Sequence, residues 1–181
     1  MFIISKIRNN EQLSKKFDAG KSLIGNVSQE ILLSPEIIKE SGWLTFLANA
    51  TKAWIKYVLN QEITKFNINS SWVVSQYANE YNQVHWHNGH ISGAGFLKVP
   101  STFGETFQKD KKNLNGKLVL IHGQRAFMSD SQFKITPEVG DFYIFPHYLM
   151  HTVYPFKDTD EERRSISFNA VIDEKIFDVF Y

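Results

Sequence analysis

The sequence predicts a mainly β fold, with an all-β body preceded by a helical N-terminal flank. Three observations predict it. Before residue 60, apolar residues recur at three- and four-residue spacings, as on one face of a helix. After Asn69 the pattern changes to an alternation of period two. The strand-like runs there are short and separated by turn residues, as in a sandwich, a barrel or a jelly roll.

The helical flank has a recognisable start. Ser34 can cap a helix, and Pro35 suits its first turn. Ser41-Gly42 is expected to interrupt the helix near its start. An amphipathic stripe follows, and we expect it to pack on the main body. Its members are Trp43, Phe46, Leu47, Ala50, Trp54, Val58 and Leu59.

Six runs in the later part of the chain are predicted to be strands. They are residues 72–77, 91–99, 117–121, 141–145, 152–156 and 165–172. Because no linker or internal repeat divides the chain, we expect a single domain over residues 1–181. Within it, residues 1–68 are expected to form a mostly helical flank, and residues 69–181 the core that carries the site.

Composition excludes several classes of protein. The 181 residues are 43% hydrophobic, enough for a core, and the absence of cysteine excludes disulfides and thiolate metal sites. Lys and Arg number 20 against 19 Asp and Glu, so no nucleic-acid partner is expected. Apolar runs are too short for a membrane span or a signal peptide. A cytoplasmic location is therefore expected, in the host cytoplasm if the chain is viral.

The histidines indicate a metal site. His85 and His87 are two residues apart, so in a strand both side chains leave the same face and can converge on one ion. A third ligand must come from elsewhere. His151 opens a predicted strand and is favoured over His147, which follows a proline in an expected surface loop. His90 is the alternative to His87 as the third nitrogen ligand.

The last predicted strand has one unusual face. Arg163, Ser165, Ser167 and Asn169 alternate on it, whereas Arg164 shares the other face with apolar residues. Such a polar face suits either the lining of a polar cavity or an exposed edge strand. In a cavity, Arg163 could pair bidentately with a carboxylate while Ser165 donates another hydrogen bond.

The order of these features resembles that of the Fe(II)- and 2-oxoglutarate-dependent oxygenases. The closest resemblance is to the small 2OG-Fe(II) oxygenases of marine bacteria and their phages. It covers roughly residues 70 to 172 and depends on the combined order of short motifs. The matching pieces are His85-Trp86-His87, Ser92-Gly93, Val99-Pro100, Pro137 to Asp141, Phe145-Pro146, His151 and Arg163 to Asn169.

The resemblance implies a double-stranded β-helix, the jelly-roll form of barrel, and an oxidoreductase. It implies that Fe(II) is held by His85, His87 and His151, with no catalytic residue beyond this metal centre. It also implies that Arg163 and Ser165 bind 2-oxoglutarate, the cosubstrate, with Tyr77 as a further contact.

The implied reaction is a dioxygenation, most simply a hydroxylation. O2 and 2-oxoglutarate are the implied partners, and oxidation of a substrate C–H bond is coupled to decarboxylation of 2-oxoglutarate to succinate and CO2. A peptide or protein is the implied substrate, with peptidyl proline the nearest analogy. No membrane partner is implied.

His87 departs from the broader family, in which Asp or Glu usually completes the triad. A third imidazole leaves the iron site one charge more positive. Two other functions fit the same local pattern: a cupin-like metal-binding module without turnover, and a virus-derived structural protein that kept the jelly roll alone. Only the enzyme converts 2-oxoglutarate to succinate.

Overall fold

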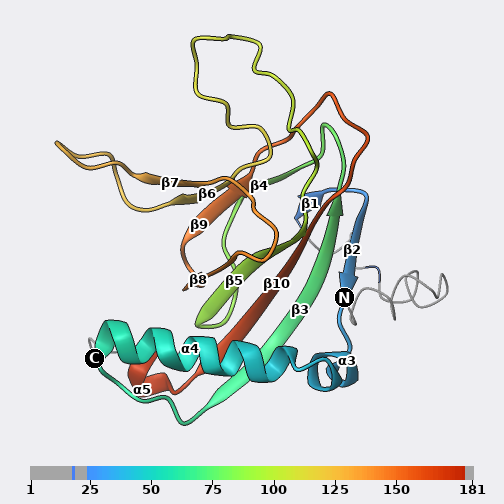
Figure 1. Cartoon of the computed structure of the whole chain (residues 1–181). Helices are drawn as coiled ribbons and strands as arrows, with labels where there is room; N and C mark the ends of the chain where they lie inside the picture. The colour runs from blue at the N-terminus through green and yellow to red at the C-terminus, as the bar shows by residue number, and fades with distance from the viewer. Residues whose placement is uncertain (1–17, 19–23, 178–181) are drawn as a thin grey trace.

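Two five-stranded antiparallel sheets form the body of the protein in the computed structural model, which describes residue 18 and residues 24–177 (Figure 1). One sheet has the order β1-β4-β9-β6-β7, with strands Gly25–Asn26, Tyr81–His85, Met150–Val153, Leu118–Ile121 and Gln132–Ile135. The other has the order β2-β3-β10-β5-β8, with strands Gln29–Leu32, Phe66–Gln76, Arg163–Ile172, Ile91–Lys98 and Phe142–Pro146.

The chain passes repeatedly from one sheet to the other, as in a jelly roll. From β3 onward it visits the two sheets in alternation, staying in one sheet only for the hairpin β6–β7. This confirms the mainly β, jelly-roll prediction. The predicted single domain over 1–181 stays a prediction, because residues 1–17, 19–23 and 178–181 lie outside the described part.

The predicted helix start and its interruption are both present. Helix α3 (Pro35–Glu40) begins after Ser34, whose side chain accepts a hydrogen bond from the Ile37 N–H. Gly42, at φ 78°, separates α3 from α4 (Trp43–Leu59) because it adopts a left-handed conformation that favours glycine. No helix among the described residues is long and apolar enough to cross a membrane.

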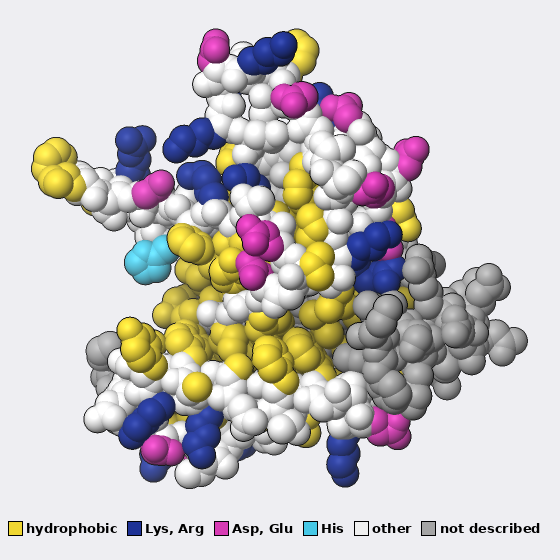
Figure 2. Space-filling model, in the orientation of Figure 1, with side chains coloured by type: hydrophobic (Ala, Val, Ile, Leu, Met, Phe, Trp, Pro, Cys, Tyr) yellow, Lys and Arg dark blue, Asp and Glu magenta, His cyan; other side chains and the backbone are white. Residues whose placement is uncertain are grey.

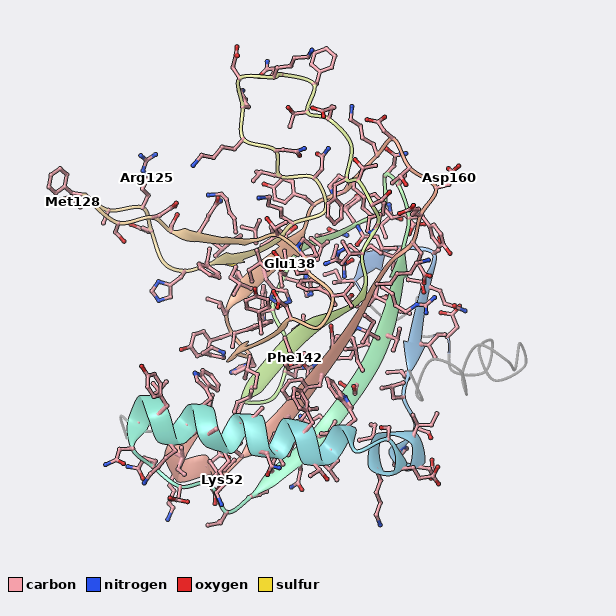
Figure 3. All side chains as sticks on the ribbon, viewed as in Figure 1. Lys52, Arg125, Met128, Glu138, Phe142 and Asp160 are labelled. Atoms are coloured by element: carbon pink, nitrogen blue, oxygen red, sulfur yellow. The ribbon has the colours of Figure 1, made fainter. Side chains whose placement is uncertain are left out.

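Helix α4 covers the outer face of the sheet that contains β10. Leu47 and Ile55 of the helix form one buried cluster with Phe168 and Ala170 of β10. Phe142 of β8 packs edge-on against the Trp43 ring at the start of α4 (Figure 3). Figure 2 shows hydrophobic side chains gathered between α4 and the sheets. The predicted amphipathic stripe therefore packs on the β body only in part. Trp43, Leu47 and Trp54 pack there, whereas Phe46, Val58 and Leu59 are exposed.

Some strand boundaries differ from the prediction. The strand predicted over 152–156 is β9, which begins at Met150 and ends at Val153, two residues before Pro155, which has no N–H to donate. Strands β1 and β2 lie in the segment expected to be mostly helical. They, β4 and β7 are absent from the six predicted runs. Strand β1 has only two residues, too few to display an alternation.

Candidate metal centre

Three histidines converge between the two sheets. His85 ends β4 and lies directly opposite His151 of β9 in the antiparallel register. His87 follows two residues later, beyond the end of β4. One ring nitrogen from each of the three lies within 4.8 Å of the others, and the Nε2 atoms of His87 and His151 are 3.1 Å apart.

Backbone hydrogen bonds orient the histidine rings. His85 Nδ1–H donates to the Gln83 carbonyl at 2.7 Å, and His151 Nδ1–H donates to the Leu149 carbonyl at 2.9 Å. These bonds fix the tautomer and leave Nε2 of each ring with a free lone pair. His147 holds His87 in place: its carbonyl accepts the His87 N–H, and its Nδ1–H donates to the His87 carbonyl.

The three rings are neutral near pH 7. Burial, followed by the neighbouring histidines, lowers the pKa of His87 to about 3. Burial, then His85, lowers the pKa of His151 to about 4, and burial lowers that of His85 as well. Neutral imidazole is the form that binds a metal ion. The Nε2 atoms of His87 and His151, 3.1 Å apart, are close enough for both to bind one ion.

A buried arginine lies in the same cavity as the three histidines. Arg163 is 2% exposed, and the lining also includes Val74, Leu118, Ser165 and Ser167. We call this cavity the inner pocket. The Arg163 Nη1–H donates to Gln76 Oε1 at 3.0 Å, and the guanidinium lies 5.1 Å from the centre of the Phe96 ring.

Arg163 lacks a counter-ion among the described residues. Its Nε is buried with no hydrogen-bond partner, and burial lowers its pKa to about 10, so it stays charged at pH 7. A buried charge without an opposite charge is unfavourable by several kcal/mol. The inner pocket therefore provides a positive group with unused donor capacity, facing the same space as the histidines.

Sequence comparison identifies the family. A family model described as "Putative 2OG-Fe(II) oxygenase" matches residues 70–169. This chain belongs to that family of 2OG-Fe(II) oxygenases. It is thus an oxidoreductase of the class that uses Fe(II) and 2-oxoglutarate. A comparison with curated proteins finds no match.

Solved structures of low sequence identity share the jelly-roll fold. HygX from Streptomyces hygroscopicus, solved with nickel and 2-oxoglutarate, has a TM-score of 0.56 and 11% identity over 93% of this chain and 77% of its own. A viral collagen prolyl hydroxylase from Paramecium Bursaria Chlorella virus-1 gives 0.51 and 18%, over 86% of both chains. A Burkholderia pseudomallei oxidoreductase of the 2OG-Fe(II) oxygenase family gives 0.52 and 12% over 81% of this chain. The chain spans 61% of that protein's length.

The residues of this oxygenase fit both groups that its family uses. Three neutral imidazoles with adjacent nitrogens suit a divalent iron ion. The unused donor of Arg163, buried in the same pocket, suits a carboxylate. The donor set is all nitrogen, with no carboxylate among the three clustered side chains.

The structure places the other candidate residues as follows. Ser165 lines the inner pocket of the oxygenase beside Arg163, whereas Tyr77 does not line it. Strand β3 ends at Gln76, so Tyr77 lies in the following turn and is 38% exposed. His90 is turned away from the triad: its Nδ1 accepts the Ile172 N–H, and its ring stacks on Phe177.

Two features of the oxygenase site were missed by sequence reasoning. Gln76 and Phe96 contact the Arg163 guanidinium, and Gln76 lies directly opposite Arg163 in the β3–β10 register. A pairing register cannot be read from one strand alone. The expectation that His85 and His87 share one strand was also wrong, since β4 ends at His85. The two rings meet because the loop after β4 is held by His147.

Proposed function

We propose that this oxygenase is a hydroxylase in which His85, His87 and His151 hold Fe(II), while Arg163 and Ser165 hold 2-oxoglutarate. One observation carries the proposal: a buried arginine without an acidic partner faces the same pocket as three neutral, convergent histidines. A structural role alone would leave that buried charge unpaired, at a cost in stability. A dicarboxylic acid that reaches from the metal to Arg163 satisfies both ends.

When bound together, Fe(II), 2-oxoglutarate and O2 supply the oxidation of a substrate C–H bond, with release of succinate and CO2. The protein's residues bind and orient. Arg163 and Ser165 place the far carboxylate, and Gln76 keeps the guanidinium in position through its amide oxygen. Apolar neighbours such as Val74, Phe96 and Leu118 keep water away from this end of the pocket.

The finer part of the proposal is a peptide or protein substrate, oxidised at proline. It is supported by the viral collagen prolyl hydroxylase, which shares the fold over 86% of both chains at 18% identity. This support is an analogy at the level of the fold.

The direct test measures succinate. The full chain, loaded with Fe(II), is incubated with 2-oxoglutarate in air, with and without a proline-containing peptide. We expect succinate in amounts that depend on both metal and 2-oxoglutarate, and more of it with the peptide. A protein that binds Mn(II) and 2-oxoglutarate but never yields succinate would be a metal-binding module instead. A peptide that leaves the succinate yield unchanged would contradict the proposed substrate.

A further inference from the structure

A second cavity opens on the solvent side of the histidines. It has a volume of about 440 Å³ and shares His85 and His87 with the inner pocket. Its remaining lining includes Asn69, Ser70, Asn88 and Asn169, and we call it the outer groove. The candidate metal centre therefore lies at the junction of the two cavities, with Arg163 beyond it on the buried side.

An irregularity in β3 builds one wall of the outer groove. Asn169 of β10 pairs with Ser70, whereas the next residue of β10, Ala170, pairs with Ile68. Asn69 is thus the extra residue of a β-bulge. In a regular strand, neighbours point to opposite faces, yet Asn69 and Ser70 both line the groove. The bulge turns an additional amide toward the groove.

The polar groups of the outer groove are neutral amides and a hydroxyl. The Asn169 amide is held by Ser92, whose hydroxyl donates to Oδ1 at 2.8 Å, and its Nδ2 lies 3.5 Å from Ser70 Oγ. Within the described part of the chain, the side chains of Asn69 and Asn88 make no hydrogen bond, and both are exposed. Each offers donors and an acceptor to a ligand.

The described lining of the outer groove contains no Lys, Arg, Asp or Glu. A free amino acid, which carries an ammonium and a carboxylate, would find no counter-ion there. The groove is open to solvent instead of enclosed, whereas small-molecule sites bury most of their ligand. Trp86, at its rim, is 64% exposed and presents a flat apolar surface. These features suit a chain segment that passes through the groove.

We propose that the outer groove binds an uncharged segment of an extended polypeptide and so selects the substrate. Asn69, Ser70 and Asn88 exchange hydrogen bonds with its peptide groups, and Trp86 packs on an apolar side chain such as a proline ring. Asn169 is a positioning residue that holds Ser70. This inference rests on the proposed function, because it assigns the proposed peptide substrate to named residues of a groove beside the same metal centre.

The test uses ten-residue peptides, acetylated and amidated, in which proline alternates with alanine, lysine or glutamate. Binding is measured by calorimetry on the full chain with Mn(II) and 2-oxoglutarate present and oxygen excluded. We expect the alanine peptide to bind more tightly than either charged peptide, and free L-proline not to bind. Tighter binding of a charged peptide, or of free proline, overturns the inference.

Variants locate the binding. Asn69→Ala should weaken binding of the alanine peptide about fivefold, the effect of one hydrogen bond, and Trp86→Ala about tenfold. The matched control is Asn67→Ala, an exposed asparagine of β3 outside the groove, which should bind the peptide as wild type does. Unchanged peptide affinity in both Asn69→Ala and Trp86→Ala would overturn the assignment.

Failure of the groove assignment can be distinguished from failure of the proposed function. The affinity for 2-oxoglutarate is measured by a separate titration with Mn(II) present and without peptide. It should be equal in wild type, Asn69→Ala and Trp86→Ala. If wild type binds 2-oxoglutarate but not the alanine peptide, the groove assignment is wrong and the proposed cosubstrate site stands. If wild type binds no 2-oxoglutarate, the proposed function fails and this inference fails with it.

Discussion

The two faces of β10 place neighbouring arginines in opposite circumstances. Arg164 and Arg163 are both buried, at 7% and 2% exposure. On the outer face, Arg164 forms a two-point ion pair with Glu162, in which Nε donates to Oε1 at 2.7 Å. On the inner face, Arg163 donates to the amide oxygen of Gln76 and lies over the Phe96 ring, and its Nε–H has no hydrogen-bond partner.

This difference separates a charge that is paired within the protein from one that has no acidic partner among the described residues. Glu162 is also 3% exposed, and it accepts from Ser75 and faces Lys98 at 3.7 Å, so the outer-face pair is satisfied within the protein. A strand selected only for stability has no reason to leave a second buried arginine without an acid. The inner face leaves a buried charge without an acidic partner, and the 2-oxoglutarate proposed above would supply one.

The largest expected effect is on 2-oxoglutarate affinity. Arg163→Ala should weaken it by about 2–5 kcal/mol, because a buried, hydrogen-bonded charge pair is lost. Arg163→Lys should restore part of it, since an ammonium lacks the planar fork of a guanidinium. Arg164→Ala should leave it unchanged. Titration of 2-oxoglutarate with Mn(II) present measures all three variants. Loss of affinity in Arg164→Ala, with normal binding by Arg163→Ala, would reverse the assignment of the two faces.

The second effect is on stability, and here the substitution of Arg164, not of Arg163, is expected to be the damaging one. Arg164→Met should lower the free energy of unfolding by about 3 kcal/mol, because it leaves Glu162 buried without its main partner. Arg163→Met should leave the ligand-free protein at least as stable as wild type, since it removes an unpaired buried charge. Urea unfolding without metal or 2-oxoglutarate measures both. A larger loss in Arg163→Met would show that Arg163 is structural.

The polar face of β10 could be predicted because strand alternation alone separates Arg163 from Arg164. The partners of Arg163 could not be predicted, because Gln76 contacts Arg163 through the pairing register of β3 and β10, which cannot be read from a single strand. Tyr77 was expected near 2-oxoglutarate from the family resemblance. In the structure β3 ends at Gln76 and the chain turns at Asn79, whose φ is 69°, so Tyr77 lies outside the lining of the inner pocket.

The convergence of His85 and His87 was predicted, but the strand geometry used to predict it is absent from the structure. His85 and His87 were expected to converge as alternate residues of one strand. In the structure, His87 lies outside β4, and hydrogen bonds to His147 hold its backbone. His147 was assigned to the surface because it follows a proline, and a contact between two loops leaves no periodic signal. The histidine spacing identified the cluster, although not what positions it.

The third effect is on metal affinity. His85→Ala, His87→Ala and His151→Ala should each weaken Mn(II) binding at least tenfold, about 1.4 kcal/mol. His87→Asp should still bind the metal, because two histidines and a carboxylate form the commoner triad. The control is His90→Ala, whose ring is engaged by Ile172 and Phe177. Metal binding that survives His87→Ala and disappears in His90→Ala would move the third ligand to His90.

The smallest effect is on thermal stability. It concerns a charged residue that directly follows β10, at the end of the strand opposite Arg163. Asp173 follows Ile172, the last residue of the strand, and is half-buried. Its carboxylate accepts from the Thr64 N–H and hydroxyl and from the Lys65 N–H, at 2.6–2.9 Å. These bonds, the Thr64 hydroxyl first, lower the pKa of Asp173 to about 2. Unlike Arg163, this charge is fully satisfied in the absence of any ligand.

A folded-state pKa below the unfolded value of about 3.9 means that the ionised form stabilises the fold. The contribution is complete above about pH 4 and is lost as the pH falls through about 2. Asp173→Asn should therefore lower the Tm at pH 6, and its difference from wild type should shrink between pH 4 and pH 2. Asp160→Asn is the control, since Asp160 is an exposed acid that precedes β10, whereas Asp173 follows the other end of the strand. A Tm difference for Asp173→Asn that is the same at pH 6 and pH 2.5 would show that the amide's shape, and not the lost charge, is responsible.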